Sequence, residues 1–171
     1  AVALTVKAFG GVHVLINNAG LGERATGGDR RPFWTMDENG FKRLMDVNIV
    51  GAFQMAKAVA PRLIKQKWGR ILNVTKSRES MLEPLISAYG PSKAGLEAMA
   101  LCWAVELLDT GVAVNWFSPG GPVDTDFMVP KRRRDAKQRG VLLNPDVVIP
   151  PALWLASEES DGIVGCHYVG R

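Results

Sequence analysis

Residues 12–20, VHVLINNAG, form an almost wholly apolar segment that ends in two asparagines, an alanine and a glycine. An apolar run with so little polar alternation predicts a strand buried on both faces, which is typical of a parallel sheet covered by helices. The asparagines follow the carboxyl end of that strand, where open α/β sheets bind ligands. The glycine lets the backbone turn or approach a ligand closely. This segment therefore predicts a parallel α/β fold and one edge of a site.

The rest of the chain alternates between helical and strand-like segments. Helices are predicted up to about residue 9, with a cap at Gly10 and Gly11, and over 35–67, 87–109 and 145–157. Strands are predicted at 12–16, 70–74, 112–117 and 166–169. This alternation predicts one α/β domain over residues 1–171 with a parallel sheet.

Two local signals bear on the long helical region 35–67. Thr35 and Glu38 have the spacing of a capping box, so we expect the helix to begin at Thr35. Pro61 has no amide hydrogen and should kink or interrupt the helix near its end.

The apolar strand at 12–16 also needs neighbours on both of its edges, because an open edge invites aggregation. Only one predicted helix precedes it in the chain. We therefore expect these residues to be the latter part of a larger domain.

Composition and charge exclude several classes of protein. With 47% hydrophobic and 22% charged residues the chain is not disordered, and it has no apolar run near the roughly 20 residues of a membrane helix. Cys102 and Cys166 are far apart, which predicts a cytoplasmic protein with neither a disulfide framework nor a metal site. The basic run at 131–139 has no interleaved aromatic residues, so we expect a mobile, solvated loop and no nucleic-acid partner.

The segment YGPSK, residues 89–93, carries the clearest candidate for chemistry. Tyr89 and Lys93 are four residues apart and hence neighbours on one helix face. Pro91 suits the first turn, which places Tyr89 at or just before the start of the helix. The ammonium of Lys93 is expected to lower the phenol pKa from about 10, so that the pair can exchange protons.

Two further segments contribute polar groups. Asn48 lies within an apolar helical run, and its buried amide needs partners; either a core hydrogen bond to backbone or a relay to Lys93 would satisfy it. The stretch 114–127, VNWFSPGGPVDTDF, ends a third buried strand with a stiff turn. We expect the segment 123–143 that follows to cover the site.

Taken in order, these motifs resemble the short-chain dehydrogenase/reductase family. The matching motifs are NNAG at 17–20, Asn48, GRILNV at 69–74, YGPSK at 89–93 and VNWFSPGGPVDT at 114–125. The resemblance covers the C-terminal two-thirds of the family's domain. It implies a doubly wound, Rossmann-like sheet whose N-terminal βαβ portion is absent from these residues.

The resemblance also implies an activity and a set of roles. The expected reaction is hydride transfer between NAD or NADP and a small carbonyl or secondary-alcohol substrate. Tyr89 would be the acid/base, Lys93 would hold the nicotinamide ribose and tune Tyr89, and Asn48 would anchor a proton relay. The residues implied to line the cofactor, besides Tyr89 and Lys93, are Asn17, Ala19, Gly20, Pro119, Gly120 and Thr125.

The chain departs from the family's pattern in three places. The glycine-rich phosphate turn is absent, and with it the residue that selects NAD or NADP. One extra residue lies between Gly120 and Thr125. The family's carbonyl-orienting serine lies thirteen positions before the tyrosine, and that position is Lys76.

We expect Ser77 to donate the hydrogen bond at this turn and Lys76 to face solvent, because neighbouring side chains of an extended segment point to opposite faces. Thr75 is the reserve donor. In the alternative, Lys76 occupies the serine's place and the protein is slow or inactive. A catalytically degenerate member that binds a nucleotide or a partner without turnover is the alternative function.

The helix at 87–109 is apolar on two sides. A second apolar side, formed by Leu101, Val105 and Leu108, predicts a helix-to-helix contact in a homodimer or homotetramer. The alternative is a deeply covered core helix.

Overall fold

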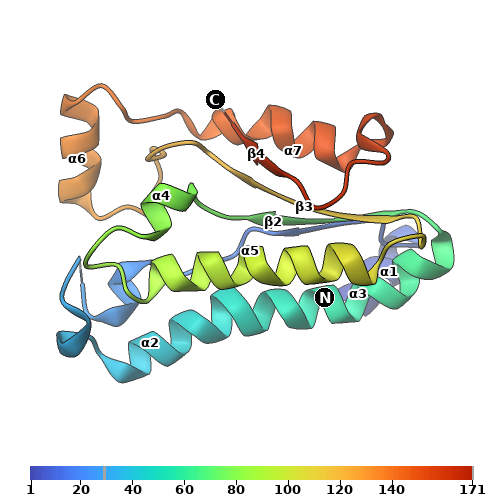
Figure 1. Ribbon diagram of the computed structural model, residues 1–171, viewed down its shortest axis with the longest axis horizontal. Helices are drawn as coiled ribbons and strands as arrows, with labels where there is room; N and C mark the ends of the chain where they lie inside the picture. The colour runs from blue at the N-terminus through green and yellow to red at the C-terminus, as the bar shows by residue number, and fades with distance from the viewer. Residues whose placement is uncertain (29, 171) are drawn as a thin grey trace.

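A computed structural model describes residues 1–28 and 30–170 of the chain (Figure 1). Within these residues four parallel strands form one sheet in the order β1-β2-β3-β4. The strands are β1 (Val14–Asn17), β2 (Gly69–Val74), β3 (Val112–Ser118) and β4 (His167–Val169). The parallel sheet confirms the predicted α/β class.

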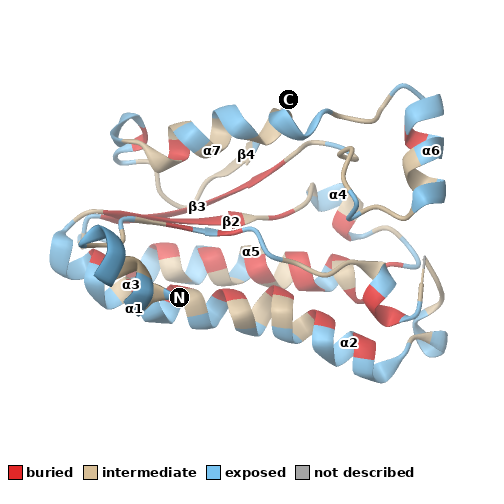
Figure 2. Ribbon diagram, turned by 180° about the vertical axis from the view of Figure 1, so that it is seen from behind, coloured by how far each residue is buried: buried red, intermediate tan, exposed pale blue. Residues whose placement is uncertain are grey.

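Helices cover the sheet on both faces, as a doubly wound fold requires (Figure 1). One face carries α1 (Val2–Phe9), α3 (Ala52–Gln66) and α5 (Tyr89–Glu106), and the other carries α7 (Ile149–Ala156). Ile71 packs with the first group, and Leu72, the next residue of β2, packs with Leu155 of α7. This alternation follows from the two-residue period of a strand, and Figure 2 shows the buried residues along the strands and on the inward sides of the helices.

Strand β1 is an edge strand of this sheet, although its sequence is that of a central one. Leu15 is buried in the core beneath α3, but Ile16, on the opposite face, is 43% exposed. Within the described residues the strand therefore has an open edge and an uncovered face. Its apolar sequence instead suits a strand that is covered on both faces.

The predicted helix over 35–67 is divided into three segments. They are α2 (Glu38–Met45), a π-helical turn (Asp46–Gly51) and α3. Asp37 is the N-cap, and its carboxylate accepts a hydrogen bond from the Gly40 amide at 2.7 Å. The prediction of a Thr35 cap was wrong, because Thr35 ends a short 3₁₀ turn and its hydroxyl donates to Pro32 O.

Helix α3 continues through Pro61 to Gln66, so the predicted interruption was also wrong. The proline removes one intrahelical hydrogen bond. The helix is held at this point by Val59 and Leu63, which are fully buried against the sheet and outweigh that loss.

Two short helices lie in segments that the sequence predicted as turn or loop. Helix α4 (Arg78–Met81) follows β2, and α6 (Pro130–Gln138) contains most of the basic run. Arg133 of α6 forms ion pairs with Asp124 and Asp126. The expectation of a loop was therefore wrong, since most of the run is helical, whereas most of its residues are exposed to solvent as expected.

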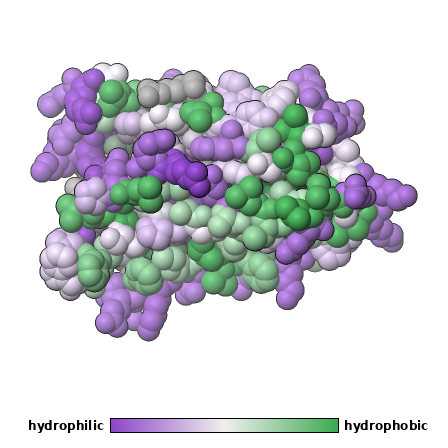
Figure 3. Space-filling view, in the orientation of Figure 1, coloured by the Kyte–Doolittle hydropathy of each residue, from purple (hydrophilic) through white to green (hydrophobic). Residues whose placement is uncertain are grey.

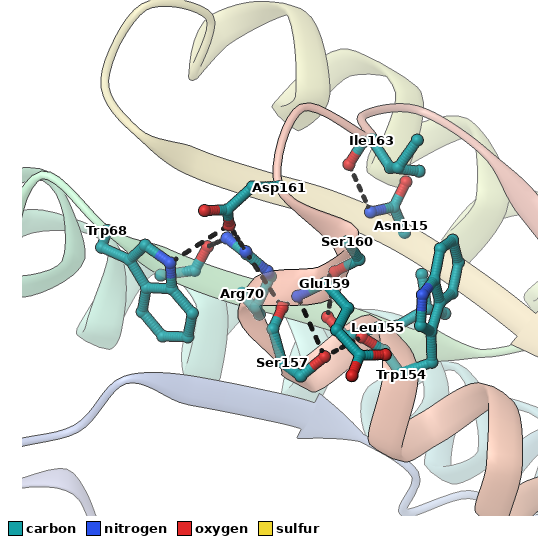
Figure 4. Close-up of polar contacts among 11 residues, drawn as sticks. Trp68, Arg70, Asn115, Trp154, Leu155, Ser157, Glu159, Ser160, Asp161 and Ile163 are labelled. Carbon is teal, nitrogen blue, oxygen red and sulfur yellow. Dashed lines mark hydrogen bonds and ion pairs between the residues drawn. The ribbon is translucent and has the colours of Figure 1, made fainter.

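A polar cluster at the amino end of β2 ties the C-terminal segment to the sheet (Figure 4). Arg70 is only 2% exposed, forms an ion pair with Asp161 and donates to Ser157 O at 3.2 Å. The Trp68 ring lies against its guanidinium, with 4.3 Å from Cζ to the ring centre. The cluster lies at the opposite end of the strands from the predicted site.

No helix in residues 1–28 and 30–170 is both long enough and apolar enough to cross a membrane.

Candidate active site

Tyr89 and Lys93 lie at the carboxyl ends of the strands, where α5 begins. Tyr89 is the first residue of α5, as Pro91 predicted. Gly90 allows this start to pack closely on α4, since a Cβ there would lie 2.1 Å from Met81 O. Lys93 is 4% exposed; its Nζ donates to Val74 O at 2.8 Å and lies 5.9 Å from the centre of the Tyr89 ring. The predicted pair is therefore brought together at the end of β2.

Asn48 is 1% exposed and lies in the π-helical turn between α2 and α3. Its Oδ1 accepts from Leu21 N at 2.7 Å, and its Nδ2 donates to Leu21 O at 3.0 Å and to Ser92 Oγ at 2.9 Å. The core hydrogen bond to backbone is thus present, and a relay to Lys93 stays a prediction. The amide holds the loop that follows β1, and a π-turn in a helix often marks a functional position.

Gly20 lies close to both Asn48 and Lys93. A Cβ at Gly20 would lie 3.3 Å from Asn48 Oδ1 and 3.6 Å from Lys93 Nζ. The missing side chain therefore lets the loop after β1, the π-turn and α5 converge at one point.

Burial shifts the protonation of both groups of the pair. It raises the pKa of Tyr89, and the charge of Glu23 acts in the same direction. Burial also lowers the pKa of Lys93 to about 8. The expected lowering of the Tyr89 pKa was wrong for the chain by itself, because the loss of phenolate solvation dominates. At neutral pH the phenol is protonated and most Lys93 ammonium groups are charged.

The turn after β2 does not have the expected orientation. Lys76 Nζ lies 5.8 Å from the Tyr89 ring centre and donates to Ser80 O at 2.9 Å, so the expectation that Lys76 faces solvent was wrong. The Ser77 and Ser80 hydroxyl oxygens are 2.7 Å apart, and Ser80 Oγ donates to Ser77 O. Since a hydroxyl has one hydrogen, Ser77 must be the donor between the two hydroxyls. Whether Ser77 also donates to a substrate stays a prediction.

Buried polar atoms without partners lie beside this site. Asn17 Nδ2 donates to Asn73 Oδ1 at 2.9 Å. Among the described residues, Asn73 Nδ2 and the hydroxyl of Thr75 are buried without a hydrogen-bond partner. Thr75, the reserve donor, and Asn73 are two residues apart in sequence. By alternation their side chains point to the face of the sheet that α3 and α5 cover, as Ile71 does. Buried unpaired polar atoms are uncommon and are consistent with a polar ligand at this end of the sheet.

The turn after β3 contributes cover. Gly120 has a left-handed backbone, with φ 82°, and Pro119 is half-buried. Thr125 N donates to Val123 O at 2.8 Å, and the Phe127 ring lies 5.5 Å, centre to centre, from the Tyr89 ring. Phe127 thus contacts Tyr89, and the expectation that the whole segment 123–143 covers the site stays a prediction. No described interaction joins Pro119, Gly120 or Thr125 to Tyr89, so their cofactor roles stay predictions.

Sequence reasoning missed two residues of the site. Ser92 accepts from Asn48 and donates to Tyr89 O at 2.8 Å; its position three residues after Tyr89 was the available signal. Phe127 had no signal, because its contact depends on how the segment after β3 folds back.

Ala19 is exposed on the loop after β1. Among the described residues no cluster of His, Cys, Asp or Glu is suited to a metal ion.

A parallel α/β sheet with a tyrosine–lysine pair at its carboxyl ends defines a Rossmann-like protein with acid/base groups at the ligand side of the sheet. A family model described as short chain dehydrogenase matches residues 1–136. The chain belongs to the short-chain dehydrogenase family.

Similar proteins are longer than this chain. A short-chain type dehydrogenase/reductase of Picea abies is 34% identical over 91% of this chain and 58% of its own length. The 3-oxoacyl-(acyl-carrier-protein) reductase of Thermotoga maritima is 33% identical over 96% of this chain and 66% of its own. The solved 3-ketoacyl-(acyl-carrier-protein) reductase of Brucella melitensis superposes with TM-score 0.86 at 24% identity, over 98% of this chain and 69% of its own, and so shares the fold. The chain thus spans about three-fifths to two-thirds of these relatives.

Proposed function

We propose that the protein carrying this chain is an NAD- or NADP-dependent oxidoreductase that interconverts a small carbonyl compound and its secondary alcohol. The observation that carries the proposal is the convergence of three elements beside Tyr89. Asn48 Oδ1 and Lys93 Nζ both lie close to Gly20 on the loop after β1. The names of the family and of its relatives support a dehydrogenase or reductase.

The residues at the carboxyl ends of the strands fit a nicotinamide cofactor. The unpaired buried atoms of Asn73 and Thr75 are the feature that supports the fit. The residues proposed to hold it are Asn17, Ala19, Gly20, Tyr89, Lys93, Pro119, Gly120 and Thr125. When bound, NAD or NADP supplies or accepts the hydride. Solved structures of similar fold contain NADP, in the gluconate 5-dehydrogenase of Burkholderia cenocepacia, or NADH, in the Brucella reductase.

Tyr89 Oη is proposed to move the proton. Its raised pKa keeps the phenol protonated at neutral pH, which suits donation to a substrate oxygen during carbonyl reduction. In the reverse direction the nearby Lys93 ammonium favours the phenolate electrostatically. Asn48 is also proposed to anchor a proton relay towards Lys93, since Asn48 Oδ1 and Lys93 Nζ both lie close to Gly20. Phe127 lies beside the Tyr89 ring and is proposed to limit the access of water to it.

Ser77 is proposed to donate a hydrogen bond to the substrate oxygen. It would have to exchange its bond to Ser80 Oγ for one to the substrate. Such an exchange costs little where both acceptors are neutral oxygens. Ser77→Ala should then lower turnover about a hundredfold and leave cofactor affinity unchanged.

One observation favours the second candidate, a family member that binds a nucleotide or a partner without turnover. Lys76 lies beside Tyr89 at the position where the resemblance implies a serine. A long charged side chain there restricts the room for a substrate.

Tyr89→Phe tests the proposal, with NAD(P)H oxidation measured against a panel of aldehydes and ketones. Turnover should fall by about a hundredfold or more, while cofactor affinity stays within about twofold, because only the exchangeable proton is lost. Phe127→Leu is the matched control, since it changes the packing on the same ring without removing a proton. Near-normal turnover of Tyr89→Phe would refute the role of Tyr89. Tight cofactor binding by a wild-type protein that turns over nothing would favour the second candidate.

We further propose a homo-oligomer in the cytoplasm, with α5 in the contact. Val105 is 68% exposed, and Leu101 and Leu108 are exposed as well. Within the described residues these side chains are uncovered, which supports a contact rather than the deeply covered alternative. Figure 3 shows hydrophobic surface along the side of the molecule where α5 and α3 lie. An exposed apolar helix face of this kind is typical of a surface that another protein covers.

A further inference from the structure

Lys76 is a half-buried cation beside the proposed acid/base. Its Nζ is about as far from the Tyr89 ring centre as Lys93 Nζ is, at 5.8 Å and 5.9 Å. An ammonium has three hydrogens, and the described structure shows one of them donated, to Ser80 O at 2.9 Å. No carboxylate of the described residues lies within ion-pair distance of Lys76 Nζ.

The acids that act on Lys76 are already paired. Glu83 and Glu23 are the carboxylates whose charges favour its protonated form. Glu83 forms an ion pair with Arg30, and Glu23 forms one with Arg132 at 3.6 Å. The two arginines offset the two glutamates, which leaves Lys76 without a dedicated counter-charge.

The environment of Lys76 penalises an unpaired charge. Burial is the largest influence on its pKa and lowers it from the usual value. A buried cation without a partner is costly, and the cost is relieved when an anion approaches. Lys76 is therefore able to bind an anion, and the anion would lie beside Tyr89.

We propose that Lys76 binds a carboxylate of the substrate, so that the enzyme acts on keto acids or hydroxy acids in preference to neutral ketones and alcohols. This inference rests on the proposed function, because Tyr89 Oη must reach the carbonyl or hydroxyl of the same molecule. Lys76 Nζ lies 5.8 Å from the centre of the ring that carries Tyr89 Oη, so a small molecule can contact both the ammonium and the hydroxyl. One ammonium can bind one carboxylate group. Arg30 and Arg132, which could add further positive charge for a phosphate, are engaged in ion pairs.

The first experiment measures binding without turnover. The intact protein is acetylated with limiting acetic anhydride, and the rate at each lysine is read by peptide mass spectrometry with and without malonate. Malonate should slow the acetylation of Lys76 about threefold or more and leave Lys65, exposed on α3, unchanged. Dimethyl malonate, and sodium chloride at the same ionic strength, should protect neither lysine. Equal rates at Lys76 with and without malonate, or equal protection by chloride, would overturn the inference.

The second experiment compares two ketones that differ in charge, acetoacetate and its methyl ester. Lys76→Met and Lys76→Gln should each lower kcat/KM for acetoacetate by about tenfold to a hundredfold, the range for a lost hydrogen bond to a charged group, and change that for the ester less than about threefold. Glutamine can keep a hydrogen bond to Ser80 O, so agreement of the two variants assigns the loss to the charge. Lys76→Arg should keep the preference for the acid.

An equal loss on the acid and the ester would overturn the inference, since Lys76 would then act on the reacting oxygen that both ketones share. If the wild-type protein turns over neither ketone, the protection of Lys76 by malonate still decides whether it binds a carboxylate. Failure of the proposed oxidoreductase activity is thereby distinguished from failure of the anion site.

Discussion

The replacement of Asn48 by leucine should loosen the loop that follows β1 and measurably destabilise the fold. The leucine has a similar volume but cannot form the two hydrogen bonds with Leu21, at 2.7 Å and 3.0 Å. Leu21 N–H and C=O would then be without partners in a half-buried position. A buried unsatisfied group costs about 1–3 kcal/mol. Because water can reach part of this loop, we take the lower end, about 1 kcal/mol for each of the two groups, and expect a loss of about 2 kcal/mol.

Urea unfolding, followed by far-ultraviolet circular dichroism in the protein carrying this chain, measures this loss. Ser92→Ala is the matched control, because it removes the hydrogen bond between Asn48 and Ser92 and leaves Leu21 held. It should cost about 1 kcal/mol, the value of one hydrogen bond. If Asn48→Leu were no more destabilising than Ser92→Ala, the amide would not be what holds Leu21, and the reasoning would be refuted.

Three further predictions follow from the site and the surface. The pKa of Lys93 is lowered to about 8 in the folded protein, so the unfolded chain binds more protons between about pH 8 and 10. The free energy of unfolding should therefore gain a contribution that rises with pH across this window, and Lys93→Met should abolish that contribution. Equal pH dependence of the unfolding free energy in the two proteins would contradict the lowered pKa of Lys93. Gly20→Ala should weaken NAD(P) binding at least about tenfold, measured by titration calorimetry, since its Cβ would lie 3.3 Å from Asn48 Oδ1. The free energy of unfolding should change by less than about 1 kcal/mol, because Gly20 has no left-handed backbone. An unchanged affinity for NAD(P) would mean that Gly20 is not part of the cofactor site. Val105→Glu should reduce the oligomer to smaller species in light scattering, with Leu4→Glu on α1 as the control that leaves it intact; a wild-type monomer would refute the α5 contact.

The start of α5 could be predicted from the sequence because its signals are local. Pro91 favours the first turn, and the four-residue spacing puts Tyr89 and Lys93 on one helix face whatever the rest of the fold does. The apolar run at 12–16 likewise predicts a buried strand, because a stretch of this kind is costly to expose. These features depend on a few neighbouring residues. The structure begins α5 at Tyr89 and has a strand at Val14–Asn17, although one face of that strand is exposed.

The partners of the polar groups could not be predicted in the same way. Asn48 meets Leu21 across 27 positions of the chain, and only the packing of the π-turn against the loop after β1 brings them together. The helical state of the basic run depends on ion pairs of Arg133 with Asp124 and Asp126, which local propensity does not reveal.

The sequence by itself determined the fold class, the order of the four strands along the chain and the tyrosine–lysine pair, because hydrophobic periodicity and short-range spacing encode all three. Only the tertiary structure decided which way the turn after β2 faces. Alternation predicts that Lys76 and Ser77 diverge, but not which of them turns inwards. Helix α4 decides it: its Ser80 binds the Ser77 hydroxyl through Oγ and the Lys76 ammonium through its carbonyl oxygen, so the charge lies beside Tyr89.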